Sequence, residues 1–281
     1  MKLQGNAGAL DAKAGAAPAR EASAASFRAA NAASFATARV QVWDLPLRVF
    51  HWSLVLAVAV ALVTGELGGS LMEIHAKAGL TIVGLVAFRL TWGLVGSTHA
   101  RFLRFAPTPA RLRAYLQGRW HGVGHNPLGA FSVFALLGLL AVQATTGLFG
   151  NDDITFTGPL FELVEESFAG KLTTLHKQLA NLLIGLVVLH LAAIVFYARV
   201  KRRNLVKPMV TGWTEVRASA AEAEPLPDRR GGGPLAFVLA LAVALGAVWV
   251  ANGGPWKTAQ PAAAPAAATT TDAPAAAKPA W

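Results

Sequence analysis

Four apolar segments, each close to twenty residues long, constrain this chain more than any other feature. They cover about residues 47 to 66, 75 to 96, 127 to 149 and 174 to 198. A helix needs about twenty apolar residues to cross the hydrocarbon core of a bilayer, so each segment predicts a transmembrane helix. The chain is 54% hydrophobic and only 14% charged, which is unlike a soluble domain. The sequence therefore predicts an all-α integral membrane protein.

A fifth apolar segment, residues 234 to 251, is shorter but carries no charge. Arg229 and Arg230 precede it and Trp249 lies near its end, where such residues anchor a helix at the interfaces. We expect a four-helix transmembrane bundle with this fifth C-terminal transmembrane helix beside it. Low hydrophobicity and Ala, Ser and Pro bias predict disorder at both termini. The expected division is a disordered tail at 1–38, a membrane domain at 39–213, a linker at 214–233, a fifth helix at 234–251 and an Ala/Pro-rich disordered tail at 252–281.

The charges of the loops predict the orientation. The loop between the second and third segments has five arginines and no acid, and the stretch after the fourth segment, "ARVKRRNLVK", is equally basic. The other loops are acidic, with "ELGGSLMEI" holding two acids and no base. Basic loops stay in the cytoplasm, so the N-terminal tail is expected inside and the C-terminal tail outside. This distribution also accounts for the net charge of +10 without nucleic-acid binding.

Four of the seven histidines lie in the predicted transmembrane helices. His51 stands at the start of the first helix, His75 at the start of the second, and His176 and His190 both lie on the fourth. Ionisable groups inside a bilayer are costly, so each is a functional candidate. A single interfacial histidine that bonds a neighbouring helix is an ordinary structural feature, but four are harder to explain in that way.

Depth and face sort these histidines into pairs. His176 and His190 are fourteen residues apart, which places them within about 40° of one helix face and about 21 Å apart along the axis. Because successive helices alternate in direction, His51 lies at the inner level of His190. His75 lies at the outer level of His176. The sequence therefore predicts two stacked bis-histidine sites.

The residue types at these sites favour haem. The chain has no cysteine, which excludes thiolate metal sites and covalent haem attachment through a C-x-x-C-H motif. Neither pair has an accompanying carboxylate, and zinc would require four protein ligands or an open position. Two imidazoles suit a six-coordinate haem b. Since both axial positions are filled, one-electron transfer is the expected task.

Other residues could support these sites. Arg89 lies fourteen residues after His75, on the same face but at the inner level, where it can pair with a haem propionate. The alternative is an arginine that extends to the cytoplasmic headgroups. Gly65 is expected to face the outer haem, and His125 is a minor candidate for a propionate or quinone contact. A surface helix is expected from Thr108 to Gly118. Gly79, Gly84 and Gly185 are expected to give a macrocycle the same room, with a close helix contact that involves no cofactor as the alternative.

Four stretches resemble, in order, the bacterial cytochrome b561 proteins and the b-type cytochrome subunit of nickel–iron hydrogenases. They are "VWDLPLRVFHWSLVLAVAVALVTGE", "HAKAGLTIVGLVAFRLTWGLVGSTHARF", "GHNPLGAFSVFALLGLLAVQATTGLF" and "LHKQLANLLIGLVVLHLAAIVFY", followed by "NLVKPMVTG", over about residues 40 to 213. The resemblance implies a bacterial inner-membrane protein with two b haems, ligated by His51, His75, His176 and His190. Members pass electrons between the quinone pool and a hydrogenase, a periplasmic cytochrome or a small oxidant such as superoxide.

Three functions stay open at this stage. The leading hypothesis is a dihaem electron carrier linked to quinone. The second is a self-sufficient superoxide:quinone oxidoreductase, and the third is a non-redox transporter whose histidines bind metal or protons. The sequence leaves open whether the chain forms a homodimer. Polar candidates for quinone contacts at the ends of the helices are Gln143, Thr145, Lys177 and Asn181.

Overall fold

The computed structural model describes residues 37–120, 122, 124–152, 156–217 and 232–257. Most of the two predicted tails and of the linker at 214–233 lies outside these residues. Within the described ranges, five helices are long and apolar enough to cross a membrane, which confirms the predicted fold class. They are α3 (Leu45–Leu67), α4 (Met72–Val95), α7 (Pro127–Gly147), α8 (Glu166–Arg199) and α11 (Pro234–Ala251).

Short elements connect these helices. A helix forms where the surface helix is predicted, and the Thr108 side chain caps it by accepting from the Arg111 backbone N–H at 3.3 Å. The short elements are η1 (Gly69–Leu71), α5 (Phe102–Phe105), α6 (Pro109–Leu116), η2 (Phe161–Leu163), α9 (Val206–Thr211) and α12 (Gly254–Lys257).

Local sequence signals set where the long helices begin and end. Asp44 caps α3 by accepting from the Leu47 N–H at 2.7 Å, and Asn126 caps α7 in the same way through Gly129. A proline follows each cap within the first turn, where its missing N–H costs nothing. Gly68 has a φ of 63°, and this backbone conformation ends α3 and lets the chain reverse into α4.

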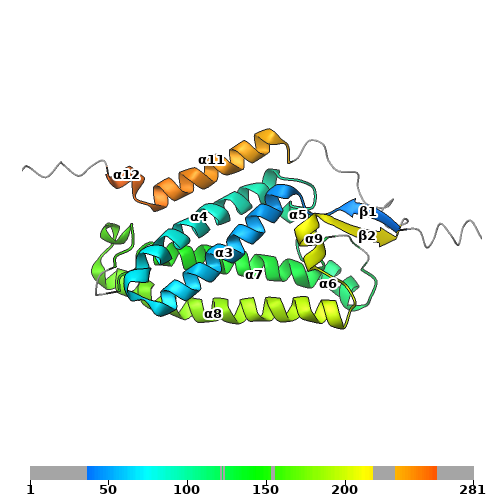
Figure 1. The fold of residues 1–281 in the computed structure, drawn as a ribbon, viewed down its shortest axis with the longest axis horizontal. Coiled ribbons are helices and arrows are strands. Elements are labelled where there is room, and N and C mark those ends of the chain that lie inside the picture. The colour runs from blue at the N-terminus through cyan, green and yellow to red at the C-terminus, as the bar shows by residue number, and fades with distance from the viewer. Residues whose placement is uncertain (1–36, 121, 123, 153–155, 218–231, 258–281) are drawn as a thin grey trace, which may run out of the picture.

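The four core helices form two hairpins. α3 packs against α4, α7 packs against α8, and α4 joins the hairpins through its contact with α7 (Figure 1). α8 has 34 residues and begins at Glu166, earlier than the predicted start near residue 174. At 1.5 Å per residue it is about 51 Å long, so it extends beyond the hydrocarbon core of a bilayer.

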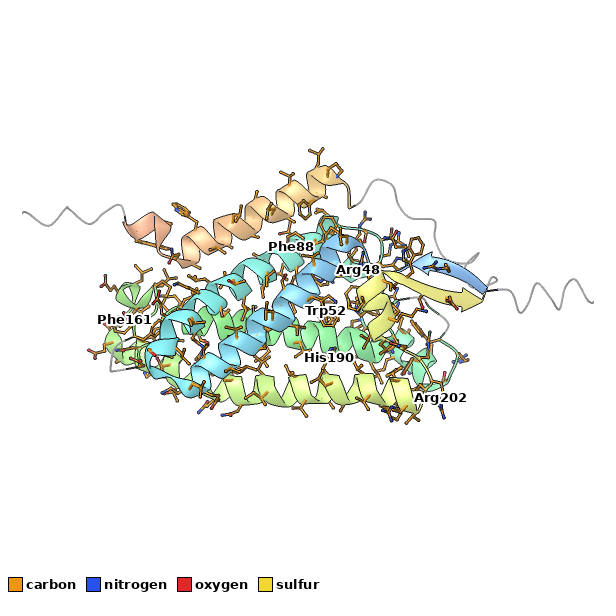
Figure 2. The ribbon with its side chains drawn as sticks, in the orientation of Figure 1. Arg48, Trp52, Phe88, Phe161, His190 and Arg202 are labelled. Carbon is orange, nitrogen blue, oxygen red and sulfur yellow. The ribbon has the colours of Figure 1, made fainter. Side chains whose placement is uncertain are left out.

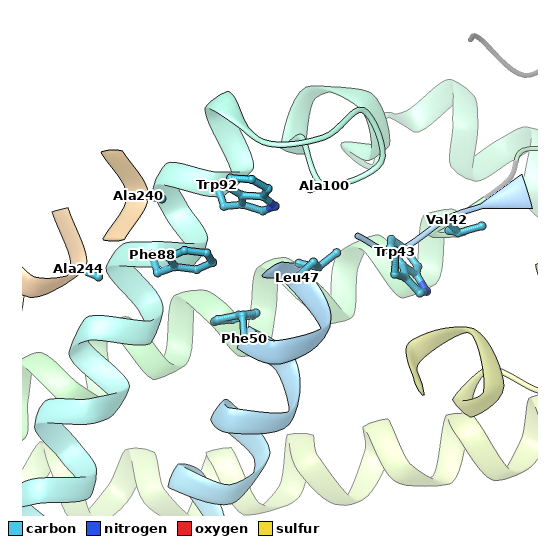
Figure 3. Packing of buried hydrophobic residues seen from close by; sticks show 9 residues of the cluster. All are labelled: Val42, Trp43, Leu47, Phe50, Phe88, Trp92, Ala100, Ala240 and Ala244. Atoms are coloured by element: carbon cyan, nitrogen blue, oxygen red, sulfur yellow. The ribbon is translucent and has the colours of Figure 1, made fainter. Parts of the chain in front are cut away.

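The fifth helix, α11, lies along α4 on the side away from the bundle (Figure 1). Small residues make this close packing possible, because Ala240 and Ala244 are buried against a cluster that includes Phe88 and Trp92 (Figure 3). A second buried cluster lies between the core helices. Its members are Ala57, Ile82, Val86, Leu137, Leu140 and Leu183.

A two-stranded antiparallel sheet, which the sequence did not predict, closes one end of the bundle. β1 (Thr37–Gln41) pairs with β2 (Trp213–Arg217). The Gly212 carbonyl accepts from the N–H groups of Val42 and Trp43 at 2.9 and 3.2 Å. The sheet ties together the two ends of the four-helix domain, so the predicted domain boundaries at residues 38 and 214 fall inside its strands.

The two ends of the bundle differ in charge. We call the end with the sheet, α5 and α6 the basic end, and the end with η1 and η2 the acidic end; Figure 2 labels Arg202 at the former and Phe161 at the latter. The described residues of the acidic end include six acids and three lysines. These are Glu66, Glu73, Asp152, Glu162, Glu165 and Glu166, with Lys77, Lys171 and Lys177.

Candidate cofactor sites

His75 of α4 and His176 of α8 meet at the acidic end. Their ring centres are 6.0 Å apart and the ring planes are nearly perpendicular, at 84°. Two imidazoles on opposite sides of one metal ion have ring centres about 6 Å apart, because each metal–nitrogen bond is about 2 Å and each ring centre lies about 1.1 Å behind its nitrogen. The observed spacing therefore fits a single six-coordinate iron shared by the two side chains.

Hydrogen bonds fix the protonation of both rings. The Nδ1–H of His75 donates to the Ala61 carbonyl at 2.8 Å, and that of His176 donates to the Gln143 carbonyl at 2.9 Å. A carbonyl oxygen can only accept, so Nδ1 carries the proton and Nε2 keeps a lone pair. This is the usual arrangement of a histidine that ligates a metal through Nε2.

Gln143 also reaches His176 through its side chain. Its amide Nε2 donates to the His176 Nε2 at 3.2 Å, whereas its Oε1 is buried and has no hydrogen-bond partner among the described residues. A buried amide oxygen without a partner is costly, and a site that holds a polar or charged group can supply one. The unpaired oxygen is consistent with a cofactor beside His176.

Two glycines make room for these imidazoles. A Cβ placed on Gly65 would lie 2.9 Å from the His75 ring, and one on Gly147 would lie 2.8 Å from the His176 Cε1. Both distances are shorter than real Cβ contacts allow, so each ring needs a glycine beside it. Gly65 faces the acidic-end site as predicted. Gly147 was missed, although its place at the end of the third apolar segment puts it at the depth of His176.

The other predicted glycines behave differently. A Cβ on Gly84 would meet the Val248 side chain at 2.8 Å, so Gly84 packs against α11, which is the helix-contact alternative. Cβ atoms on Gly79 and Gly185 would meet nothing within 4 Å. Gly79 lines the acidic-end cavity.

A cavity of about 480 Å³ adjoins the acidic-end pair, and residues of all four core helices line it. This volume falls within the range of about 300–1,000 Å³ that is usual for ligand and cofactor sites. Three of the four polar quinone candidates, Gln143, Lys177 and Asn181, line this cavity. The fourth, Thr145, is exposed, and its hydroxyl bonds the Ala141 carbonyl of its own helix at 2.8 Å.

His51 of α3 and His190 of α8 come together at the basic end. They are close enough for their charges to interact, and Figure 2 shows His190 toward the end of α8 nearer the sheet. The His190 Nδ1 lies 3.3 Å from the Ser132 hydroxyl, a contact that the sequence reasoning missed. The Nδ1 of His51 is buried and has no partner among the described residues. The structure thus brings together both predicted histidine pairs.

Each pair bridges the two hairpins of the bundle. His51 and His75 belong to the α3–α4 hairpin, whereas α8 supplies both His176 and His190. α8 packs mainly against α7 rather than against α3 or α4. A metal-centred group held by either pair would therefore connect helices that have little direct packing of their own.

Comparison with known proteins now identifies the membrane domain. The sequence pattern of prokaryotic cytochrome b561 matches residues 42–212, which begin just after β1 and end just before β2. The chain belongs to the prokaryotic cytochrome b561 family. It is therefore a multi-pass membrane protein of a b-type cytochrome family, and this membership implies haem b and membrane electron transfer.

Curated relatives carry a name that agrees with this assignment. A probable Ni/Fe-hydrogenase B-type cytochrome subunit of Azotobacter vinelandii is 28% identical over 62% of this chain and 88% of its own length. The protein of the same name from Cupriavidus necator is 26% identical over 61% of this chain and 85% of its own length. A probable Ni/Fe-hydrogenase 1 B-type cytochrome subunit of Escherichia coli K12 is 25% identical over 38% of this chain and 57% of its own length. No solved structure matches the chain significantly.

Arg89 of this cytochrome b561 is buried, with only 2% of its surface exposed. Its Nη1 donates to the Ala100 carbonyl at 3.1 Å, and its guanidinium lies 4.4 Å from the centre of the Phe102 ring. The alternative in which Arg89 extends to the headgroups is therefore wrong. Contact between Arg89 and a haem propionate stays a prediction.

Asp44 and Arg48 fix the start of α3, one to two turns before His51. Besides capping the helix, Asp44 accepts from the Trp92 Nε1 at 3.0 Å and from the Ser97 hydroxyl. Arg48 donates to the Val210 carbonyl at 2.6 Å. These bonds tie α3 to α4 and α9, so they hold the helix entrance at the basic end and position the His51 backbone.

His125 lies at the basic end, just before α7. Its ring centre is 4.5 Å from that of Trp43 and 4.5 Å from that of Phe105. Burial lowers the pKa of His125 to about 3, and the charges of Arg89, His99 and His51 act in the same direction. His125 is therefore neutral at physiological pH and packs as an aromatic side chain. Its predicted contact with a propionate or a quinone is untested.

Proposed function

We propose that this chain is a dihaem electron-transfer subunit that carries electrons across the membrane between the quinone pool and a redox protein. The observation that carries the proposal is the acidic-end pair: two imidazoles 6.0 Å apart, each with Nδ1 bonded to a carbonyl and each beside a glycine. His75 and His176 would hold one haem b, and His51 and His190 the other. Arg89 is the proposed propionate partner at the basic end.

Bound haem supplies a one-electron carrier at each end of the bundle. The chain's own contribution is to place the ligands and to keep them in one tautomer. His176 and His190 are separated by about 21 Å along α8, which matches a path across most of the hydrocarbon core. With a histidine pair on each iron, neither haem would offer an open position to a small substrate.

The charges support one orientation in the bacterial inner membrane. Basic loops are retained in the cytoplasm, so the basic end with His51 and His190 is proposed to face the cytoplasm. The acidic end would then face the periplasm. In this orientation the N-terminal tail is cytoplasmic and the C-terminal tail is periplasmic.

The relatives' names and the charges guide the choice of partner. The relatives are named as hydrogenase subunits, so a hydrogenase is the proposed electron donor and a membrane quinone the proposed acceptor. The six acids and three lysines of the acidic end oppose the approach of anionic superoxide. The electron carrier is therefore favoured over a self-sufficient superoxide:quinone oxidoreductase.

Electron transfer across liposomes tests this function. The purified full chain would be reconstituted into vesicles that contain trapped ferricyanide, and a membrane-impermeant reductant would be added outside. We expect haem b bands in the reduced-minus-oxidised spectrum and reduction of the trapped ferricyanide. Added menaquinol or ubiquinol should reduce the haem of the same preparation.

Two histidine variants test the assignment, and a third variant on α7 is the control. His190→Ala and His176→Ala should each leave one haem and slow the reduction of trapped ferricyanide at least tenfold. Gly138→Ala, which adds a methyl group to α7 where a Cβ meets nothing within 4 Å, should leave the rate unchanged. A preparation without b-haem bands, or one whose rate is insensitive to both histidine substitutions, would refute the proposed function.

A further inference from the structure

A second cavity lies at the basic end of the bundle, and none of the four paired histidines lines it. Its lining comes from residues between Thr98 and Pro127, which connect α4 to α7 and include α5 and α6 (Figure 1). The volume is about 270 Å³. This is below the range of about 300–1,000 Å³ that is usual for drug-sized ligands, so the cavity suits a small group better than a macrocycle.

The charge of this basic-end cavity is one-sided. Arg104 of α5 and Arg111 of α6 line it, and both side chains are exposed, so they stand at its mouth. Among the described residues that line the cavity, none is acidic. The two arginines therefore give it a formal charge of +2 when the lining histidines are counted as neutral. A concave site with charge of one sign attracts an anion.

Both arginines have donors left for such an anion. The Arg111 Nη1 donates to the carbonyls of Arg104 and Ala106 at 2.9 and 3.1 Å. These bonds hold its guanidinium in place, and its remaining N–H groups are left for a ligand. The Arg104 guanidinium forms no hydrogen bond or ion pair within the described part of the chain. Arginine forks bind the oxygens of carboxylates and phosphates well.

His125 supplies a polar group on the buried side of the cavity. Its ring is held between Trp43 and Phe105, and its Nδ1 is buried without a hydrogen-bond partner among the described residues. A buried polar atom without a partner is costly, so a ligand that bonds it would remove that cost. A neutral imidazole can carry its proton on Nδ1 and donate it to an oxyanion.

The surroundings of the mouth are apolar, which indicates where the anion comes from. Leu103, next to Arg104, is 86% exposed, and Leu116 of α6 is 70% exposed. Trp120 lines the cavity and is half-buried. In a membrane protein, exposed leucines and tryptophan beside arginines mark the depth at which acyl chains give way to head groups. A lipid can therefore bring its phosphate to the arginines while its chains cover the leucines.

We infer that the basic-end cavity binds the phosphate of an anionic phospholipid. Arg104 and Arg111 would donate to the phosphate oxygens from the mouth, and His125 would donate from the buried side. The acyl chains would lie against the exposed leucines of α5 and α6. This inference goes beyond the proposed electron transfer and does not depend on it, because it uses only the membrane fold and the residues between α4 and α7.

Native mass spectrometry of the purified full chain, with its cofactors bound, tests this inference. The delipidated protein in detergent would be titrated with dioleoyl phosphatidylglycerol and, separately, with dioleoyl phosphatidylcholine. We expect one tightly held phosphatidylglycerol. Phosphatidylcholine carries the same phosphate but no net charge, so it should bind at least about tenfold more weakly. Inorganic phosphate, added at the concentration of the lipid, should not displace phosphatidylglycerol.

Three variants test the residues of the site. Arg104→Gln should weaken binding of phosphatidylglycerol about tenfold, because it removes a charged donor. His125→Phe keeps an aromatic ring and removes Nδ1, so it should weaken binding as well. Arg113→Gln is the matched control, because it removes the same charge from α6 at a position that does not line the cavity. It should leave the affinity unchanged.

Several results would overturn the inference. Equal affinity for the two lipids, or equal losses from Arg104→Gln and Arg113→Gln, would show that no specific anionic-lipid site exists. Displacement by inorganic phosphate would make the ligand a soluble anion. Release of haem from Arg104→Gln would place a haem propionate in the cavity instead. A chain that lacks haem b but still selects phosphatidylglycerol would refute the proposed function and leave this inference intact.

Discussion

Gly147→Ala is the substitution for which the structure gives the sharpest expectation. The added methyl group would lie 2.8 Å from the Cε1 of His176, whereas ordinary contacts of a Cβ begin at 3.4 Å. The imidazole must therefore move by about 0.6 Å, the difference between these two distances. Ligand distances in metal sites are held to within about 0.2 Å, so this movement is too large for an unstrained iron ligand.

The energetic cost follows from the same contact. Overpacking a fitted site costs about 1–3 kcal/mol. Since 1.4 kcal/mol corresponds to a tenfold change in affinity, haem at the acidic end should bind about 5 to 150 times more weakly. The helix itself should not suffer, because alanine is favoured over glycine in a helix by about 1 kcal/mol. The defect should therefore appear in haem binding and not in folding.

Haem transfer to apomyoglobin measures this effect directly. The variant should release one of its two haems much faster than the wild type and retain the other at the normal rate. Gly138→Ala is the matched control, because it makes the same change on the same helix where a Cβ meets nothing within 4 Å. Equal release from the two variants, or loss of both haems from Gly147→Ala, would refute the reasoning about the acidic-end site.

Three further predictions concern the framework around the sites. Asp44→Ala removes the α3 cap and leaves the buried Trp92 Nε1–H without its acceptor. It should therefore lower the free energy of unfolding by about 2–4 kcal/mol, and Asp44→Asn should lower it by less. Equal stability of both variants and the wild type in denaturant unfolding would contradict this. Gly84→Ala should lower the free energy of unfolding by about 1–3 kcal/mol through its clash with Val248, without loss of haem. Adding Val248→Ala to this variant should restore the stability. A loss of haem would show that Gly84 serves a cofactor site. His125 is neutral in the folded chain down to about pH 3 but protonates below about pH 6.5 in the unfolded chain. The free energy of unfolding should therefore fall as the pH is lowered from about 6.5 to about 3, and the loss should be about 2 kcal/mol at pH 5. His125→Phe should flatten this acid limb, and an unchanged profile in thermal unfolding between pH 4 and 8 would count against the buried neutral imidazole.

The helices and the histidine pairs could be predicted because each depends on a short-range or periodic property. Apolar length predicted the transmembrane helices, and the fourteen-residue spacing of His176 and His190 gave their common face and their separation in depth. The alternating direction of successive helices then matched His51 with His190 and His75 with His176. The two caps, Asp44 and Asn126, carry the usual local signature of a helix start.

The remaining features depend on contacts between distant segments. β1 and β2 are short, and their facing residues Gln41 and Trp213 lie 172 positions apart in the sequence.

 Pairing over such a separation leaves no local signal in the sequence. Ser132 and Gly147 act on histidines of a neighbouring helix, and only the relative depth of two helices reveals them. The role of Gly84 stayed open between a haem and a helix contact for the same reason, since the face of α4 that contacts α11 cannot be read from α4 alone.

The haem content of histidine variants tests the central claim most directly. Each of the four single alanine substitutions should lower the haem-to-protein ratio from two to about one. The double variants His51→Ala with His190→Ala, and His75→Ala with His176→Ala, should lose no more haem than their single parents, whereas a combination across the pairs, such as His51→Ala with His176→Ala, should lose both haems. A cross-pair variant that retains one haem, or a within-pair variant that loses both, would contradict the assignment of one haem to each end of the bundle.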